Sequence, residues 1–279
     1  MKRKYFNNRD YIVDLNNNVI ILLEPLLKDL QSDNLFLKYK KIGGSTIGNI
    51  LFPNDPYKSQ FAAFCHIARL KLPVLNTKYI DAGKILEPKI FDYFKQKTLA
   101  NLLPNQNLSI LSFDAKDYNY NYFADSNYSF LVGVPDGLIL EQDCILEIKT
   151  ANSSKLNQPL DRSYLTQASL YAYLNNNDNY KLIVLYLEPG DYNAPNLVSI
   201  DTHMLKIFDF KVDKSLVEQQ IQTIEKWYSK YTNTNISPKF DLTKDKDQIE
   251  YLLCNNEQEW IALLDKWKST NKASKSIQP

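Results

Sequence analysis

Residues 180–190, YKLIVLYLEPG, contain a continuous apolar run of strand length. Such a run is typical of a strand buried on both faces, because a half-solvated strand alternates apolar and polar residues. A helical pattern precedes it at residues 161–175, with Asp161 or Ser163 near its start, and two β-rich runs come before that helix. This order predicts an α/β (mixed α+β) fold with a central mixed β-sheet flanked by α-helices.

The remaining segments carry shorter signals of helical or strand periodicity. Helices are expected near residues 18–31, over 42–51 with Ser45 or Thr46 as N-cap, over 60–70, 77–98 and 214–231, and strands within 108–113 and 203–212. Pro88 must either begin a new helix or kink a continuous one. We expect a single domain over residues 1–231 with an N-terminal helical lead-in. A polar, Lys-rich C-terminal extension with a weak helix would follow over residues 232–279.

Composition excludes several classes of protein. The chain has 33 basic and 32 acidic residues, so a nucleic-acid partner would need a local basic patch. Three widely spaced cysteines and two histidines argue against a disulfide framework, a zinc ribbon and a four-cysteine iron–sulfur cluster. No run reaches the ~18 apolar residues of a membrane span. We therefore expect a cytoplasmic protein with no membrane partner.

Residues 132–150, VGVPDGLILEQDCILEIKT, place four acidic residues and a lysine close to a hairpin signal. In a strand, alternate side chains share a face, so Glu147 and Lys149 point one way and Ile148 points into a core. A buried charge is costly unless it is paired or bound to metal. Asp136 ends the preceding run, where Pro135 and Gly137 allow the chain to bend toward Glu147.

Two interpretations of this stretch remain open from the residues alone. It is a surface hairpin with a Glu–Lys pair, or it is a metal site. Two carboxylates aimed at one point repel each other, and Mg²⁺ relieves that repulsion with oxygen ligands. The Ile148 carbonyl could add a ligand, and Lys149 could orient a metal-bound water or help to deprotonate it.

The order Asp136, then Glu147-Ile148-Lys149, resembles the PD-(D/E)xK nuclease signature. Three further blocks resemble the YqaJ-type viral recombinase, lambda-exonuclease-like branch of that superfamily, with RecB-type nucleases as near relatives. These blocks are Gly43-Gly44-Ser45, the Gly-x-x-x-Glu-Pro pattern of residues 83–88, and Tyr164-x-x-Gln167 followed by Tyr171. The resemblance spans about residues 38–190 and implies a restriction-endonuclease-like core.

The resemblance also implies a set of site residues. Glu87, Asp136, Glu147 and the Ile148 carbonyl would bind Mg²⁺, with Mn²⁺ as a substitute, while Lys149 and Gln167 would position the attacking water. Lys41, Ser45, Tyr164 and Tyr171 would contact DNA phosphates or bases. Residues 164, 167 and 171 share one helix face. Packing in the core stays open as an alternative for Tyr171, as does a polar edge for Gln167.

By resemblance, the expected function is a Mg²⁺-dependent deoxyribonuclease, with 5′-to-3′ exonuclease action in recombination or repair. The expected partners are DNA, as linear duplex ends, a second copy of the chain in a homo-oligomer, and a single-strand annealing protein. Two alternatives remain: a RecB-like or Cas4-like nuclease without an iron–sulfur cluster, and an inactive DNA-binding relative.

Overall fold

The computed structural model describes residues 3–102 and 107–279. Its chain divides into two compact units. One, here called the sheet unit, spans Thr77–Gln219, and the other, the helical unit, combines Met1–Asn76 with Gln220–Pro279. The division differs from the boundary expected at residue 231, since the C-terminal residues group with the N-terminal ones. The single domain expected over residues 1–231 stays a prediction.

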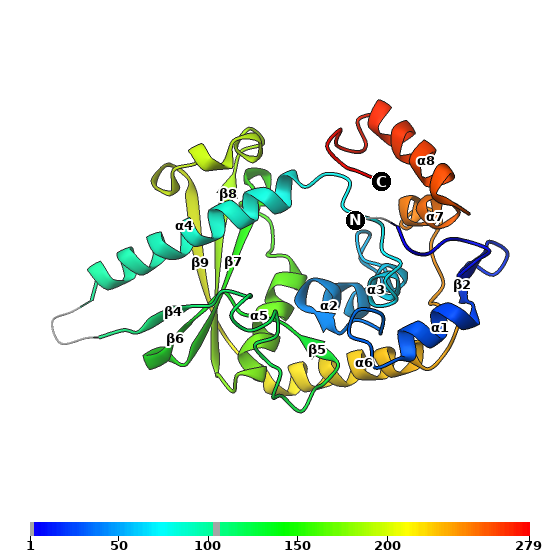
Figure 1. Ribbon diagram of the computed structural model, residues 1–279. Coiled ribbons are helices and arrows are strands. Elements are labelled where there is room, and N and C mark those ends of the chain that lie inside the picture. The colour runs from blue at the N-terminus through cyan, green and yellow to red at the C-terminus, as the bar shows by residue number, and fades with distance from the viewer. Residues whose placement is uncertain (1–2, 103–106) are drawn as a thin grey trace. The chain divides into compact units, whose positions relative to one another are not determined.

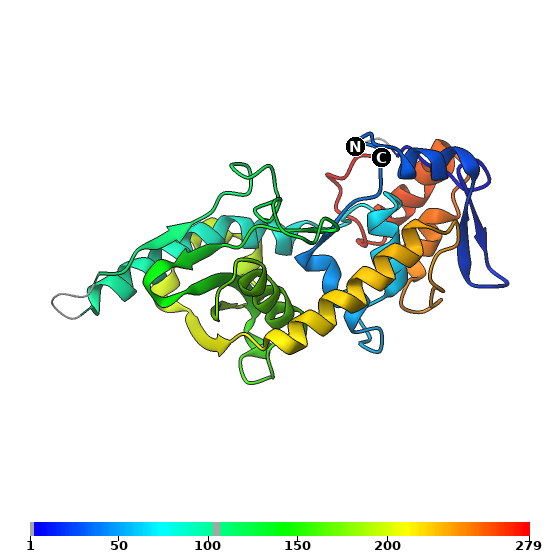
Figure 2. The same ribbon diagram turned by 90° about the horizontal axis from the view of Figure 1, so that it is seen from below.

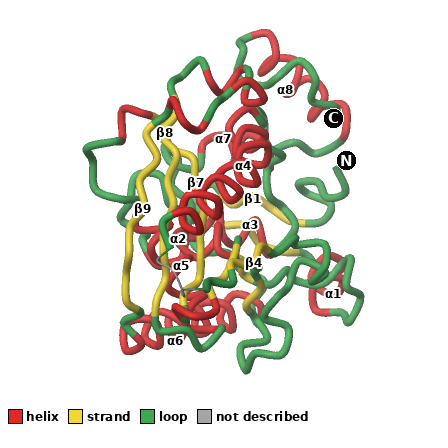
Figure 3. Tube along the Cα trace, turned by 90° about the vertical axis from the view of Figure 1, so that its left-hand side faces the viewer, coloured by secondary structure: helices red, strands yellow, loops and turns green. Residues whose placement is uncertain are grey.

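Five strands make up the central sheet of the sheet unit (Figures 1 and 3). In sheet order they are β4 (Ile110–Ser112), β6 (Gly137–Ile139), β7 (Cys144–Asn152), β8 (Asn179–Leu187) and β9 (Met204–Lys211). β7 and β8 are parallel, and the other neighbouring pairs are antiparallel. The sheet is therefore mixed, and the α/β fold class predicted from the sequence is confirmed.

Two helices bury opposite faces of β7. On one face, α4 (Lys78–Ala100) contributes to the apolar cluster that contains Leu146 and Ile148. On the other face, α5 (Arg162–Leu174) packs with Ile145. This is the alternation that a strand imposes, so Glu147 and Lys149 share the α5 side of the sheet. The remaining elements of this unit are β5 (Leu131–Val132) and the short 3-10 helices η1 (Leu140–Gln142), η2 (Ser153–Lys155), η3 (Asp191–Asn193), η4 (Pro195–Leu197) and η5 (Ile200–Thr202).

The structure decides between the alternatives that the sequence left open for Pro88 and for the N-caps of two helices. α4 runs through Pro88 as one continuous helix. Asp161 caps α5, since its side chain accepts the N–H of Ser163 at 2.8 Å. The N-cap expected at Ser45 or Thr46 is wrong, because α2 (Gly44–Leu51) already begins after Gly43 and no side chain caps it.

The helical unit begins with a hairpin, β1 (Tyr11–Asp14) and β2 (Val19–Leu22), followed by α1 (Glu24–Gln31). The chain after α6 (Lys214–Thr232) lies beside β2, where Leu22 N–H bonds Asn235 O at 2.7 Å (Figure 2). A helix over residues 18–31 was expected, but its first part is strand because this pairing satisfies the backbone. The other elements are β3 (Ile42–Gly43), α2, α3 (Gln60–Ile67), α7 (Lys246–Leu252) and α8 (Glu257–Ser269).

Two expectations from composition can be compared with this fold. Cys65, Cys144 and Cys254 are free and buried, in agreement with the absence of a disulfide framework. Within residues 3–102 and 107–279, no helix is both long enough and apolar enough to cross a membrane.

Gly137 starts β6 at a point of close approach between elements. A Cβ there would lie 2.6 Å from Leu111 O and 2.7 Å from Phe91 Cε2, whereas a Cβ at Gly190 would meet nothing within 4 Å. Overpacking of this kind costs about 1–3 kcal/mol. Gly137→Ala is therefore expected to lower the free energy of unfolding by that amount in chemical denaturation, and Gly190→Ala serves as the matched control. Equal stabilities of the two variants would contradict this packing.

Candidate active site

The end of β6 creates an opening beside β7. The two strands pair from Cys144 only as far as Leu146, which lies opposite Gly137. Beyond that point, Asp136 replaces the missing strand partner, because its Oδ2 accepts the N–H of Ile148 at 2.6 Å. The carboxyl group of Asp136 is thereby held against β7, next to Glu147.

Glu147 is a buried carboxyl group held from two sides. Its side chain is 1% exposed, and Oε1 forms an ion pair with Lys149. The same oxygen accepts a hydrogen bond from Gln167 Nε2 of α5 at 2.6 Å. Oε2 is buried and accepts no hydrogen bond from the described residues. A buried acceptor without a partner is costly, so this oxygen is suited to an incoming positive group.

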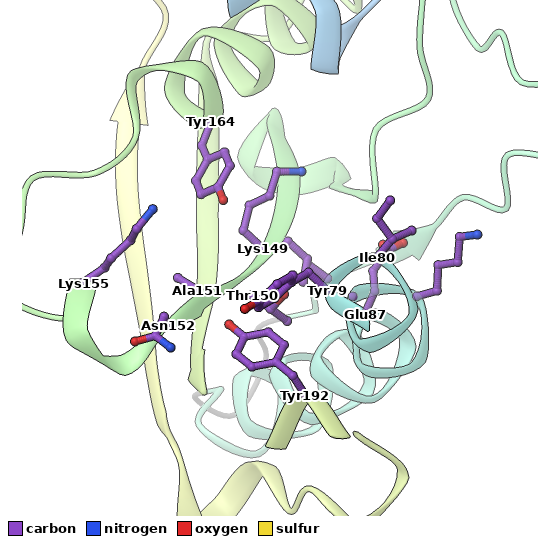
Figure 4. A pocket seen from close by; sticks show the side chains of 13 residues that line it. Tyr79, Ile80, Glu87, Lys149, Thr150, Ala151, Asn152, Lys155, Tyr164 and Tyr192 are labelled. Atoms are coloured by element: carbon purple, nitrogen blue, oxygen red, sulfur yellow. The ribbon is translucent and has the colours of Figure 1, made fainter. Parts of the chain in front are cut away.

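Glu87 reaches the same region from α4. It lines two cavities of the sheet unit, of about 650 Å³ and 700 Å³, which also share Lys84 and Ile148. The first cavity contains Lys149, and the second contains Asp136. The acidic groups therefore lie at the junction of two hollows, and Figure 4 shows Glu87 and Lys149 in the wall of the first.

The carboxyl groups of this site hold protons more tightly than usual. Burial, reinforced by the charge of Asp136, raises the pKa of Glu147 to about 8 against the opposing effect of Lys149. The same two causes raise the pKa of Glu87 to about 7. Burial also raises the pKa of Asp136, opposed by Lys149 and by the Ile148 N–H. The positive charge of Lys149 thus lowers the pKa of all three acids, but by less than burial raises it.

Lys149 keeps its positive charge next to these acidic groups. Burial alone would lower the pKa of Lys149, but the charges of Glu147 and Asp136 outweigh burial and raise it. A lysine with a raised pKa donates hydrogen bonds and stabilises negative charge, but it cannot serve as a base near neutral pH. Orientation of a water molecule, one of the two roles expected for Lys149, fits this charge state, and both roles stay predictions.

The donor set fits a hard divalent cation by its chemistry. Within the described ranges, no three His, Cys, Asp or Glu side chains lie close enough together to hold a metal ion without some rearrangement. The unpartnered Oε2 of Glu147 and the mutual repulsion among the carboxyl groups nevertheless favour an added positive charge. Carboxylate oxygens are the ligands that Mg²⁺ prefers.

The expected DNA-contact residues fall into different surroundings. Tyr164 is half-buried in the wall of the first cavity, with Lys149 Nζ 5.7 Å from the centre of its ring. Tyr171 is 4% exposed and packs against Phe123, with ring centroids 5.2 Å apart, so it offers no face to a base. Lys41 and Ser45 belong to the helical unit, and their contact with a phosphate stays a prediction.

Sequence reasoning missed several residues of the first cavity. Tyr79 and Tyr192 line it, as do Lys84 and Lys155. Helical spacing offered a signal for Tyr79, because it lies two turns before Glu87 on α4. No local pattern marks Tyr192, which follows β8 in a short 3-10 helix.

Comparisons with known proteins agree with the motif order. The family model described as "YqaJ-like viral recombinase domain" matches residues 35–174. The uncharacterized protein MG373 of Mycoplasma genitalium is 26% identical, with 81% of this chain and 91% of that protein covered. The MG373 homolog of Mycoplasma pneumoniae is 22% identical, with coverages of 81% and 90%.

Two solved structures are also similar. A phage related exonuclease from Haemophilus somnus 129PT has a TM-score of 0.47 at 12% identity, covering 71% of this chain and 95% of that one. The alkaline exonuclease LHK-Exo from Laribacter hongkongensis has a TM-score of 0.45 at 11% identity, covering 68% and 87%. The family match itself covers half of the chain, and the protein therefore belongs to the family of the YqaJ-like viral recombinase domain.

Proposed function

We propose that this protein is a metal-dependent deoxyribonuclease that hydrolyses phosphodiester bonds of DNA. The observation that carries the proposal is the convergence of Glu87, Asp136 and Glu147 on Lys149 at the junction of two cavities. Such a cluster places acidic ligands and a fixed cation where a phosphate can enter. The family match supports this function, and exonucleases are among the similar solved structures.

In this proposal, Glu87, Asp136, Glu147 and the Ile148 carbonyl would hold Mg²⁺, or Mn²⁺ in its place. The bound metal supplies positive charge to the phosphate and lowers the pKa of a coordinated water. Cations so placed stabilise the negative charge that develops on the reacting phosphate. The raised pKa values of the acids imply that metal binding displaces protons from this site.

The side chains of the sheet unit have separate roles in this proposal. Lys149, fixed by Glu147, donates to a phosphate oxygen or to the attacking water. Gln167 acts through Glu147, because its amide holds the carboxyl oxygen that faces Lys149. Gln167 is therefore a positioning residue, and its conversion to an apolar residue would release Glu147 from α5.

We further propose that the substrate is a linear duplex end and that digestion runs 5′ to 3′, in recombination or repair. A homo-oligomer and a single-strand annealing partner protein belong to the same proposal. The family description, a viral recombinase domain, supports these roles.

One assay tests the activity, its metal requirement and its direction. The purified full chain is incubated with 5′- or 3′-labelled linear duplex and with closed circular DNA, in Mg²⁺ or in EDTA. We expect early release of the 5′ label in Mg²⁺, an intact circle, and no cleavage in EDTA. Absence of metal-dependent cleavage on every substrate would refute the nuclease. Cutting of the circle would refute strict exonuclease action, and earlier release of the 3′ label would refute the direction.

A further inference from the structure

The first cavity, of about 650 Å³, has an aromatic wall beside the acidic cluster. Three tyrosines line it: Tyr79, Tyr164 and Tyr192. Tyr164 and Tyr192 face each other across it, with their hydroxyl ends toward the middle (Figure 4). Lys149, which holds Glu147, stands in the same wall. A group bound against these rings would therefore lie next to the proposed reacting centre.

Tyr79 presents an unused aromatic surface. Tyr79 is 61% exposed, whereas its neighbour Tyr192 is 6% exposed. The two rings meet edge to face, with centroids 4.7 Å apart and an interplanar angle of 65°. The buried ring of Tyr192 fixes the position of Tyr79, and this lowers the entropy lost when another flat group stacks on it.

The cavity also carries positive charge for a phosphate backbone. Lys84 and Lys155 line it, and neither forms an ion pair with another described residue. Thr150 and Asn152 add a hydroxyl and an amide, which can bond the edge of a base. Aromatic faces interleaved with free lysines are the combination by which proteins bind single-stranded nucleic acid.

We propose that this cavity binds an unpaired nucleobase of the strand being cut, stacked on Tyr79. The inference rests on the proposed function and narrows its substrate to a strand with unpaired nucleotides at the site. A volume of about 650 Å³ is that of a pocket for a small molecule, so it has room for one or two nucleotides. Because every base has an aromatic face, the site accepts all four bases.

Binding is measured without cleavage, by titrating the full chain in EDTA with short single strands that carry the fluorescent base 2-aminopurine at successive positions. Stacking should quench the fluorescence at a single position. Tyr79→Leu should remove this quenching and weaken binding about 5- to 150-fold, the range that corresponds to loss of one stacked base. Tyr79→Phe should retain both properties. Tyr57→Leu is the matched control, since Tyr57 is 90% exposed and belongs to the helical unit.

A strand with an abasic residue at the quenched position allows a double-mutant cycle, in which the protein and the strand are altered separately and together. Its binding should be equally weak with the unaltered chain and with Tyr79→Leu, because the stacked base is already missing. If Tyr79→Leu leaves binding unchanged, or weakens the intact and abasic strands by the same factor, the base site is refuted.

The labelled-duplex assay on the same protein separates this inference from the nuclease. Base-dependent binding without cleavage in Mg²⁺ would refute the nuclease and leave the base site standing. Cleavage in Mg²⁺, together with strand binding that is unchanged in Tyr79→Leu, would refute the base site alone.

Discussion

Glu147→Gln is expected to reduce DNA cleavage by about 10²- to 10³-fold or more, the loss typical of a group that stabilises transition-state charge. The substitution keeps the shape of the side chain, and the amide oxygen can still accept from Lys149. It removes the negative charge that we assign to the metal and leaves a neutral group where burial disfavours an ion. The same variant should therefore be inactive and, without metal, more stable than the unaltered chain near pH 8.

The stability effect of Glu147→Gln follows from the sign of the pKa shift. The pKa of Glu147 is about 8 in the folded chain and near 4.5 when unfolded. Between these values the folded chain holds a proton that the unfolded chain has released, so stability falls as the pH rises. For one proton, the slope is about 1.4 kcal/mol per pH unit. Glutamine does not titrate, so the variant should show a flatter dependence from pH 5 to pH 8.

Thermal or chemical unfolding in EDTA at several pH values measures this slope, and cleavage of the labelled duplex measures the activity. Glu225→Gln is a matched control, because Glu225 is exposed on α6. The control should retain activity and the pH dependence of the unaltered chain. Full activity in Glu147→Gln would contradict its place in the site, and an unchanged slope would contradict its raised pKa.

The core of the sheet could be predicted because its signals are local. The apolar run of β8, the spacing of Asp136, Glu147 and Lys149, and the helical pattern of α5 all lie within about 55 consecutive residues. Strand alternation then placed Glu147 and Lys149 on one face, where α5 supplies Gln167.

The remaining features depend on neighbours that are distant in the chain. Residues 19–22 are apolar enough for either a helix or a strand, and pairing with β1 and backbone bonds to residues 235–237 make them strand. The aromatic wall of the first cavity combines Tyr79 at the start of α4 with Tyr192 in the turn after β8. No periodic pattern in the sequence links these two tyrosines, because more than 100 residues separate them. The burial of Tyr171 was left open for the same reason, since Phe123 lies outside its helix.

Lys149→Met is expected to lower cleavage by about 10²- to 10³-fold, again through lost stabilisation of negative charge. Its effect on stability should be opposite in sign to that of Glu147→Gln. Lys149 is the cation that supports Glu87, Asp136 and Glu147, and its removal leaves an uncompensated buried charge on Glu147. Breaking such a pair costs about 3 kcal/mol or more when the acid is ionised.

This loss of stability should depend on pH. At pH 5 the carboxyl groups of Glu87 and Glu147 are largely protonated, so Lys149→Met should cost little, and the deficit should grow toward pH 8. Unfolding in EDTA across this range tests the point, with exposed Lys226→Met on α6 as the control. Combining Glu147→Gln with Lys149→Met should recover much of the lost stability without activity, because neither charge then remains. A double variant as unstable at pH 8 as Lys149→Met alone would show that the lysine stabilises the fold by packing and not by charge.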